Sequence, residues 1–274
     1  MDRACAGRVA LVSGASRGLG AAIAARLAEE GARVAVSART LEHDDRFEGS
    51  LRETVDGIIA AGGEAVAVQC DLSNADDRRR MVAETEAALG PIDILVNNAA
   101  VTFLAPYTEF SEKRFRLMFE VQVRAPYELG QLVVPGMRER GAGWILNITS
   151  RAGVHPAGPP FDEVHKGGFT VYGMVKAALD RYTTALAAEL YEDNIAVNSL
   201  APWDNVATPG ASHHDLVADF ALEGPEWVAE AALVLCSTQP RQLTGRIAYS
   251  QPFLAEHQTR PRTTTTTTTS TTLN

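Results

Sequence analysis

Tyr172 and Lys176 are the first residues whose types and spacing could support chemistry. They lie four positions apart in a stretch with a helical pattern, so a helix would place both side chains on one face, one turn apart. A tyrosine hydroxyl has an ordinary pKa of about 10, too high for proton exchange at neutral pH. A neighbouring ammonium favours the phenolate and lowers that pKa, which would make Tyr172 a usable acid and base. The same pair also suits a core tyrosine beside a lysine with a packed aliphatic stem, so the two residues alone leave both interpretations open.

A glycine-rich stretch near the N-terminus could hold a pair of phosphates. Segment 13–20 follows the apolar run 9–12 and opens into residues 21–27, which have helix-forming composition. In a strand–turn–helix unit the first N–H groups of the helix point at an anion, and glycines let a ligand approach without Cβ clashes. A tight turn without a ligand would give the same pattern. The residues expected around the phosphates are Gly14, Ser16, Arg17, Gly18, Leu19 and Gly20.

The end of the next predicted strand indicates which dinucleotide would bind. An acidic residue about 20 positions after the glycines binds the ribose of NAD, whereas arginine accommodates the 2′-phosphate of NADP. Arg39 stands 19 positions after Gly20, and the strand end Ser37-Ala38-Arg39 contains no acid. Arg17 could add a second guanidinium, a group well suited to phosphate. We therefore expect NADP in preference to NAD, although both arginines would also suit a solvated surface.

Composition narrows the class of protein. The chain has 274 residues, of which 46% are hydrophobic and 22% charged, so it can bury a large core. Its net charge of 25 − 34 = −9 argues against nucleic-acid and anionic-membrane partners. The three cysteines show no metal-ligand spacing, and neither a leader nor a membrane-length apolar run is visible. These features predict a soluble cytoplasmic protein with reduced thiols.

Strand and helix patterns alternate along the chain. Apolar strands are predicted, with helical patterns between most of them, at 8–12, 33–38, 65–69, 92–96, 144–148, 195–200 and 246–249. This alternation predicts an α/β fold, a Rossmann-type doubly wound parallel sheet in a single domain. We assign the domain to residues 1–255 and expect the threonine-rich segment 256–274 to be disordered. A helical stretch at 111–140 contains Pro126 and Pro135, which should kink or divide it.

Four motifs in this order resemble those of the short-chain dehydrogenase/reductase family over residues 6–254. They are the glycines of segment 14–20, Asn97-Asn98-Ala99 after the fourth strand, Ser150 after the fifth, and Tyr172-Gly-Met-Val-Lys176. The resemblance implies interconversion of a carbonyl compound and an alcohol with a nicotinamide cofactor. It also implies a homodimer or homotetramer built on helices 111–140 and 172–191. Further cofactor contacts are implied for Asp71, Leu72, Asn98, Ala99, Tyr172 and Lys176.

The resemblance also implies roles for the catalytic residues. Tyr172 would be the acid and base, Lys176 would lower its pKa and hold the ribose, and Ser150 would orient the carbonyl. The family usually adds an asparagine in the central helix that helps to hold a water-linked proton path to the lysine. Gln122 stands at that position and is our fourth catalytic candidate. Its extra methylene would displace the amide by more than ~1 Å, which puts the relay in question.

Other departures from the family pattern keep alternative functions open. Ala100 stands where a glycine is usual, and Trp203 follows Pro202 where the family commonly has a glycine above the nicotinamide. Ser150 and Tyr172 are 22 residues apart, more than is usual. One alternative is an NADP-binding protein with little or no catalysis. Another is a reductase of carrier-bound 3-oxoacyl thioesters, although the predicted loops contain few basic residues.

Two irregular segments, 151–170 and 201–224, are expected to form the substrate pocket. The aromatic residues available to line it are Phe161, Phe169, Trp203 and Phe220. They favour a partly hydrophobic carbonyl compound. The same segments contain three histidines, His165, His213 and His214. No further ligand stands at suitable spacing, so we expect solvated histidines and no metal site.

Overall fold

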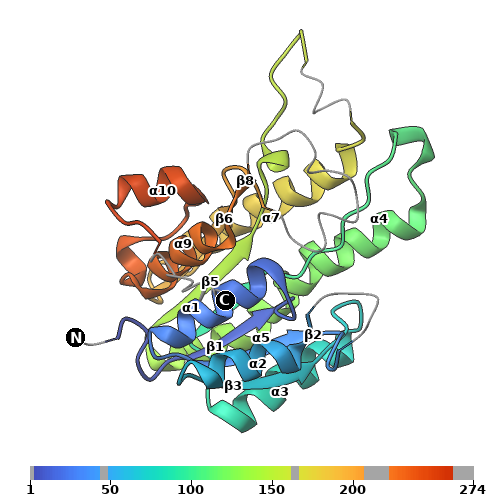
Figure 1. The fold of residues 1–274 in the computed structure, drawn as a ribbon. Coiled ribbons are helices and arrows are strands. Elements are labelled where there is room, and N and C mark those ends of the chain that lie inside the picture. Colours follow the sequence, from blue (N-terminus) through green and yellow to red (C-terminus); the bar gives the residue numbers. More distant parts are fainter. Residues whose placement is uncertain (1–2, 44–48, 162–166, 207–221, 262–274) are drawn as a thin grey trace, which may run out of the picture.

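A seven-stranded parallel sheet forms the centre of the computed structural model, which describes residues 3–43, 49–161, 167–206 and 222–261 (Figure 1). All neighbouring strands of this sheet run parallel. In spatial order the strands are β3 (Glu64–Gln69), β2 (Arg33–Ala38), β1 (Val9–Ser13), β4 (Ile94–Asn97), β5 (Gly143–Ile148), β6 (Ile195–Ala201) and β9 (Ile247–Tyr249).

Helices cover both faces of the sheet. On one face lie α1 (Gly18–Glu29), α2 (Leu51–Ala60) and α9 (Pro225–Ser237), and on the other lie α3 (Ala75–Leu89), α5 (Ala125–Arg140) and α7 (Thr170–Glu189). In β1, Ala10 and Val12 pack into the first layer while Val9 and Leu11 pack into the second. Strands buried on both faces explain the continuous apolar runs, and the doubly wound fold predicted from the sequence is confirmed.

The strand order reverses between β1 and β4. The chain runs outward from β1 through β2 to β3, then returns to β4 and continues outward through β5 and β6. In open α/β sheets ligands bind beyond the carboxyl ends of the strands at such a switch point. The glycine-rich segment follows β1 and Asn98 follows β4, so both lie at this crevice.

One continuous helix is formed by α4 (Glu112–Phe119), a π-helical segment (Glu120–Arg124) and α5. Of the expectation that Pro126 and Pro135 kink or divide it, the division was wrong. Proline lacks an N–H and its ring crowds the carbonyl four residues earlier. The π-helical segment widens the turn there, because the first residue of α5 donates its N–H to the carbonyl five residues back. The helix therefore continues past Pro126, and Pro135 lies inside α5 without ending it.

Several short elements were not predicted from the sequence. β7 (Asn205–Val206) pairs with β8 (Leu222–Glu223), and α10 (Ser250–Glu256) follows β9. The backbone after α10 turns back, with the Thr259 N–H donating to the carbonyl of Leu254 at 2.9 Å. Residues 262–274 of the threonine-rich segment lie outside the described residues. None of the described helices has the length and apolar character needed to cross a membrane.

Candidate active site

The glycine turn packs directly against the loop after β4. Gly14 has a φ of +66°, and a Cβ on it would lie 2.6 Å from the Cα of Ala99. A Cβ on Gly20 would collide with the carbonyl oxygen of Gly14 and with the side chain of Asn98. Any other residue at either position would have to displace backbone. The close approach of these two loops explains why the positions are glycine.

Asn98 joins the two loops across the switch point. Its Nδ2 donates to the carbonyls of Ser13 and Gly14, both at 3.0 Å. Ser13 Oγ in turn accepts from the N–H groups of Asn98 at 3.1 Å and Ala99 at 3.2 Å. These four hydrogen bonds hold the rim of the crevice in one geometry.

The first turn of α1 opens at the same crevice. Its N-cap is Arg17, which makes no side-chain capping bond, and the helix starts at Gly18 with a φ of +57°. Ser16 is buried, and Leu19 is half-buried against the core. Helix N–H groups without a side-chain cap beside a glycine cradle fit the phosphates of a dinucleotide.

Two arginines lie at this edge of the sheet. Arg39 follows β2 and is exposed, and its carbonyl accepts from Gln69 Nε2 at 2.7 Å. Arg17 follows β1, the strand next to β2, and its Nε lies 3.4 Å from Ser16 Oγ. The two arginines that the sequence assigns to a 2′-phosphate therefore follow the ends of adjacent strands.

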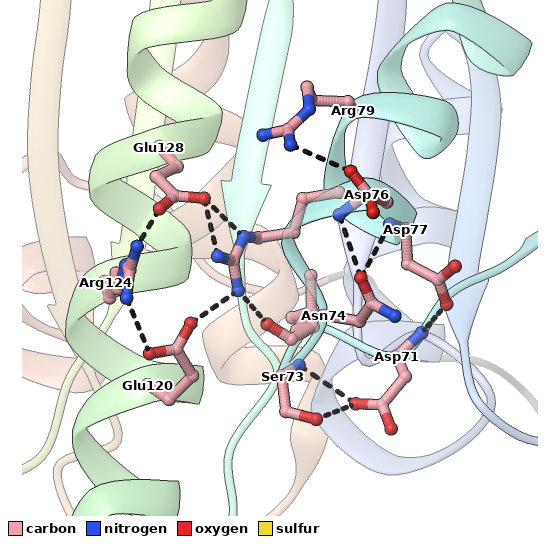
Figure 2. A network of polar contacts seen from close by, with 11 residues as sticks. Asp71, Ser73, Asn74, Asp76, Asp77, Arg79, Glu120, Arg124 and Glu128 are labelled. Carbon is pink, nitrogen blue, oxygen red and sulfur yellow. Dashed lines mark hydrogen bonds and ion pairs between the residues drawn. The ribbon is translucent and has the colours of Figure 1, made fainter.

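Asp71 and Leu72 follow β3 at the same edge. Asp71 Oδ1 accepts from the N–H of Ser73 at 2.9 Å and from its hydroxyl at 2.8 Å (Figure 2). The carbonyl of Leu72 accepts from Arg78, in α3. The turn expected at the adenine side is thus held by polar contacts on both sides.

Ser150 and Tyr172 meet beyond the carboxyl end of β5. Ser150 caps the short 3₁₀ turn Arg151–Gly153, and its Oγ accepts from the N–H of Ala152 at 3.2 Å. Tyr172 lies in the first turn of α7. Desolvation of the hydroxyl raises the pKa of Tyr172, and hydrogen bonds from the side chains of Ser150 and Thr102 oppose that rise. The side chains of Ser150 and Tyr172, both expected to be catalytic, therefore interact at this end of the sheet.

Lys176 is buried one turn after Tyr172, with only 3% of its surface exposed. Its Nζ donates to the carbonyl of Ile148 at 3.0 Å and lies 5.7 Å from the centre of the Tyr172 ring. Burial lowers the pKa of Lys176 to about 8, and the carboxylate of Asp180 opposes that shift. Ser150, Tyr172 and Lys176 form one cluster at the crevice edge.

Comparison with known proteins decides the family. Residues 8–213 match the family model described as short chain dehydrogenase. The chain belongs to the short-chain dehydrogenase family. It is 37% identical over 198 residues to human dehydrogenase/reductase SDR family member 4, covering 72% of this chain and 66% of that protein. It is 34% identical over 196 residues to ketoacyl reductase HetN of a Nostoc species, covering 72% and 63%. The chain spans just under two thirds of the length of these relatives.

Solved structures give the same assignment over a longer stretch. A short chain dehydrogenase from Mycobacterium thermoresistibile has a TM-score of 0.79 and 32% identity, covering 92% of this chain and 88% of its own. A metagenomic short-chain oxidoreductase in complex with NADP has a TM-score of 0.72 and 31% identity, covering 89% and 97%. The chain therefore has the Rossmann-like single-domain fold of the short-chain dehydrogenase family.

Gln122 of this short-chain dehydrogenase lies in the π-helical segment and is 1% exposed. Its Nε2 donates to the carbonyl of Val101 at 2.8 Å. Its Oε1 is buried and has no hydrogen-bond partner among the residues that the structure describes. Val101 directly precedes Thr102, which contacts Tyr172. Gln122 therefore fixes the loop that presents Thr102 to Tyr172.

Trp203 is fixed by contacts to its backbone and its ring. Its N–H donates to Glu223 Oε1 at 3.1 Å and to Ser250 Oγ at 2.9 Å. The Arg151 guanidinium stacks 4.6 Å from the Trp203 ring and donates to its carbonyl at 3.0 Å. Trp203, which stands where the family usually has glycine, is thus held in one position next to Arg151, the residue that follows Ser150.

Sequence reasoning missed Thr102 and Asp180. Thr102 stands in an irregular loop, where no periodicity marks it, and only the folded contact with Tyr172 reveals it. Asp180 could have been found, because it continues the spacing of four from Tyr172 and Lys176 along one helix face. Its Oδ1 accepts from Ser199 Oγ at 2.9 Å, which joins α7 to β6.

Part of the expected substrate pocket lies outside the described residues. This applies to His165, His213, His214 and Phe220. Phe169, at the start of α7, has its ring centre 6.3 Å from that of Tyr172, whereas Phe161 is half exposed. Within the described ranges, no group of three or more histidine, cysteine, aspartate or glutamate side chains could hold a metal ion.

Proposed function

We propose that this protein transfers a hydride between NADP(H) and a carbonyl compound or the corresponding secondary alcohol. The observation that carries the proposal is the cluster of Ser150, Tyr172 and Lys176 at the switch-point crevice, in which the Lys176 Nζ lies 5.7 Å from the centre of the Tyr172 ring. A nicotinamide dinucleotide bound in that crevice would supply or accept the hydride. The side chains of the chain would hold the substrate oxygen and move the proton.

Tyr172 would exchange that proton with the substrate oxygen. Desolvation raises the pKa of Tyr172, so proton exchange near neutral pH requires groups that favour the phenolate. The hydroxyl donors of Ser150 and Thr102 have this effect, and the Lys176 ammonium would add to it. Ser150 would also donate a hydrogen bond to the oxygen as negative charge develops on it.

Gln122 would support the proton path behind Lys176. Its unpartnered Oε1 is a buried acceptor that a water molecule could satisfy, as buried waters commonly do. Its amide nitrogen holds the Val101 carbonyl, which keeps Thr102 against Tyr172. In this proposal the longer glutamine replaces the usual asparagine by reaching the loop after β4.

Arg39 and Arg17 support NADP as the cofactor. They lie at the ends of adjacent strands, where the 2′-phosphate of a dinucleotide would stand. A guanidinium can bind a phosphate through two parallel hydrogen bonds. The solved metagenomic relative in complex with NADP supports the same choice.

Binding of NADPH and NADH to the purified protein tests this proposal. The protein is titrated with each cofactor while fluorescence is followed, and the titration is repeated with Arg39→Ala. Exposed Arg79 on α3 provides the matched control, Arg79→Ala. We expect tighter binding of NADPH than of NADH, with the preference lost in Arg39→Ala only. Equal binding of both cofactors to the unaltered protein would contradict the NADP assignment.

A 3-oxoacyl thioester is the second candidate substrate, because the relative HetN is named a ketoacyl reductase. Rates of NADPH consumption with a simple apolar ketone and with a 3-oxoacyl thioester of the same chain length distinguish the two candidate substrate classes. Turnover limited to the thioester would support the second candidate. A protein that binds NADPH tightly but reduces neither class would instead support a cofactor-binding role without catalysis.

We also propose that the protein self-associates through α5 and α7. Tyr127 and Leu132 on α5 and Met174 on α7 are apolar side chains that are 37–48% exposed. Exposed apolar side chains on neighbouring helices are typical of interfaces. A dimer or tetramer in light scattering, dissociated by Leu132→Glu, is the expected result, and a monomeric wild-type protein would contradict it.

A further inference from the structure

Arg78 is a buried cation in α3 that reaches the site described above only through the carbonyl of Leu72. Only 1% of its surface is exposed. Its Nε donates to Glu128 Oε2 at 2.7 Å, and its Nη1 donates to Glu120 Oε1 at 2.9 Å. Nη1 also donates to the carbonyl of Leu72. One guanidinium therefore binds the central helix at two points and the backbone after β3.

The carboxylates that hold Arg78 are themselves held. Arg124 Nε donates to Glu128 Oε1 at 2.8 Å, and Arg124 Nη1 lies 3.6 Å from Glu120 Oε2 (Figure 2). Burial opposes ionisation of Glu128, but the two guanidinium groups keep the pKa of this carboxyl below its usual value. The two arginines and two glutamates form a ring without net charge. These ion pairs and hydrogen bonds give the buried guanidinium one fixed position.

The turn after β3 depends on α3 for its shape. The Asp71 N–H donates to Asp77 Oδ2 at 3.0 Å, and the next carbonyl, that of Leu72, is bound by Arg78. Consecutive residues of the turn are thus held by consecutive residues of the helix. Because the turn stands at the carboxyl end of β3, it borders the crevice that the proposed cofactor crosses.

We propose that Arg78 is a positioning residue for the adenine side of the cofactor site. It holds the Leu72 carbonyl, and it takes its own position from Glu120 in the π-helical segment. This inference rests on the proposed function for the identity of the ligand. Gln122 stands two residues after Glu120 in the same π-helical segment. This segment therefore holds Arg78 at the adenine side through Glu120 and the Val101 carbonyl near Tyr172 through Gln122.

The first test compares Arg78→Met with Arg79→Met. Arg79 is the next residue of the same helix, and its side chain is 60% exposed and pairs with Asp76 at 2.8 Å. The probe is 2′,5′-ADP, the adenine half of NADP, and calorimetry measures its affinity. Loss of the Arg78 contacts leaves the Leu72 carbonyl without its donor, so we expect about tenfold weaker binding. Arg79→Met should stay within about twofold, because exposed ion pairs contribute little.

Steady-state kinetics separate positioning from a general effect on folding. A partly unfolded preparation has fewer active molecules, which lowers kcat but leaves KM unchanged. Arg78→Met should instead raise KM for NADPH by the same factor as it weakens 2′,5′-ADP binding, with KM for the carbonyl substrate unchanged. Arg78→Lys keeps the charge but cannot bind three acceptors in one plane, so it should restore affinity only in part.

A second variant tests the anchor without touching Arg78. Glu120→Gln keeps the side-chain size and removes one charge of the ring, so it should weaken 2′,5′-ADP binding by a smaller factor than Arg78→Met. Unchanged affinity in folded Arg78→Met protein, or unchanged affinity in Glu120→Gln if Arg78→Met does not fold, overturns the inference. Wild-type protein that binds neither NADPH nor 2′,5′-ADP overturns the proposed function itself, which is a separate result.

Discussion

The ammonium nitrogen of Lys176 lies 5.7 Å from the centre of the Tyr172 ring and donates to the carbonyl of Ile148, the last residue of β5. The lysine therefore connects the first turns of α7 to the sheet. Its environment is too apolar to favour the charge, which is why burial brings its pKa to about 8. Burial of the charged Lys176 side chain therefore costs stability, while in the proposed function the same ammonium acts on Tyr172.

Lys176→Met should stabilise the protein at neutral pH. The pKa of Lys176 falls from 10.5 to about 8 on folding, so the unfolded state binds the proton more tightly. A burial cost of about 3 kcal/mol follows below pH 8, and it disappears as the pH rises toward 10.5. Urea unfolding should show a gain at pH 7 that shrinks at pH 10, with no such trend in the exposed control Lys113→Met. A gain that grows with pH would contradict this reading.

Gly14→Ala and Gly141→Ala separate backbone strain from close packing. Both glycines have positive φ, +66° and +71°, so backbone strain alone should cost each alanine variant about 1 kcal/mol of stability, and the clash at Gly14 should add to that loss. A Cβ on Gly141 meets nothing within 4 Å, whereas one on Gly14 lies 2.6 Å from Ala99. Only Gly14→Ala should also abolish NADPH binding in a fluorescence titration. Equal effects of the two variants on binding would show that the contact with the β4 loop is unimportant.

Gln122→Asn should lower turnover although it restores the residue usual in the family. The shorter side chain cannot span to the Val101 carbonyl, which Gln122 reaches at 2.8 Å. Loss of that buried hydrogen bond should lower the free energy of unfolding by about 1–3 kcal/mol and loosen the loop that carries Thr102. Chemical denaturation and kcat measure the two effects. A clear rise in kcat would instead mean that the glutamine impairs the proton relay.

The sequence was sufficient where local pattern and burial agree. β2 was predicted over 33–38 and is found there, because a strand covered on both faces must be apolar throughout. The start of α2 likewise follows a local pattern, a serine with a glutamate three residues later, and the Ser50 hydroxyl accepts from the N–H of Glu53 at 3.2 Å. The contact between Ser150 and Tyr172 follows from the strand order, since both stand at the same edge of the sheet.

Contacts distant in sequence were not predictable in the same way. Arg78 belongs to a charged helix, and arginine is usually exposed, yet Glu120 and Glu128 bury it from a helix that follows more than 40 residues later. The π-helical segment before Pro126 has no periodicity of its own, and proline alone indicated a break. Two-residue strands such as β7 exist only through their pairing with β8.

Consumption of NADPH by wild-type protein and by Tyr172→Phe tests the central claim most directly. The assay follows NADPH absorbance with a panel of apolar ketones, after both proteins are shown to bind NADPH equally. General acid–base catalysis typically contributes about 10²–10⁴-fold, so we predict a loss of that size in kcat with cofactor affinity retained. Turnover by Tyr172→Phe at the wild-type rate would show that Tyr172 is not the acid and base.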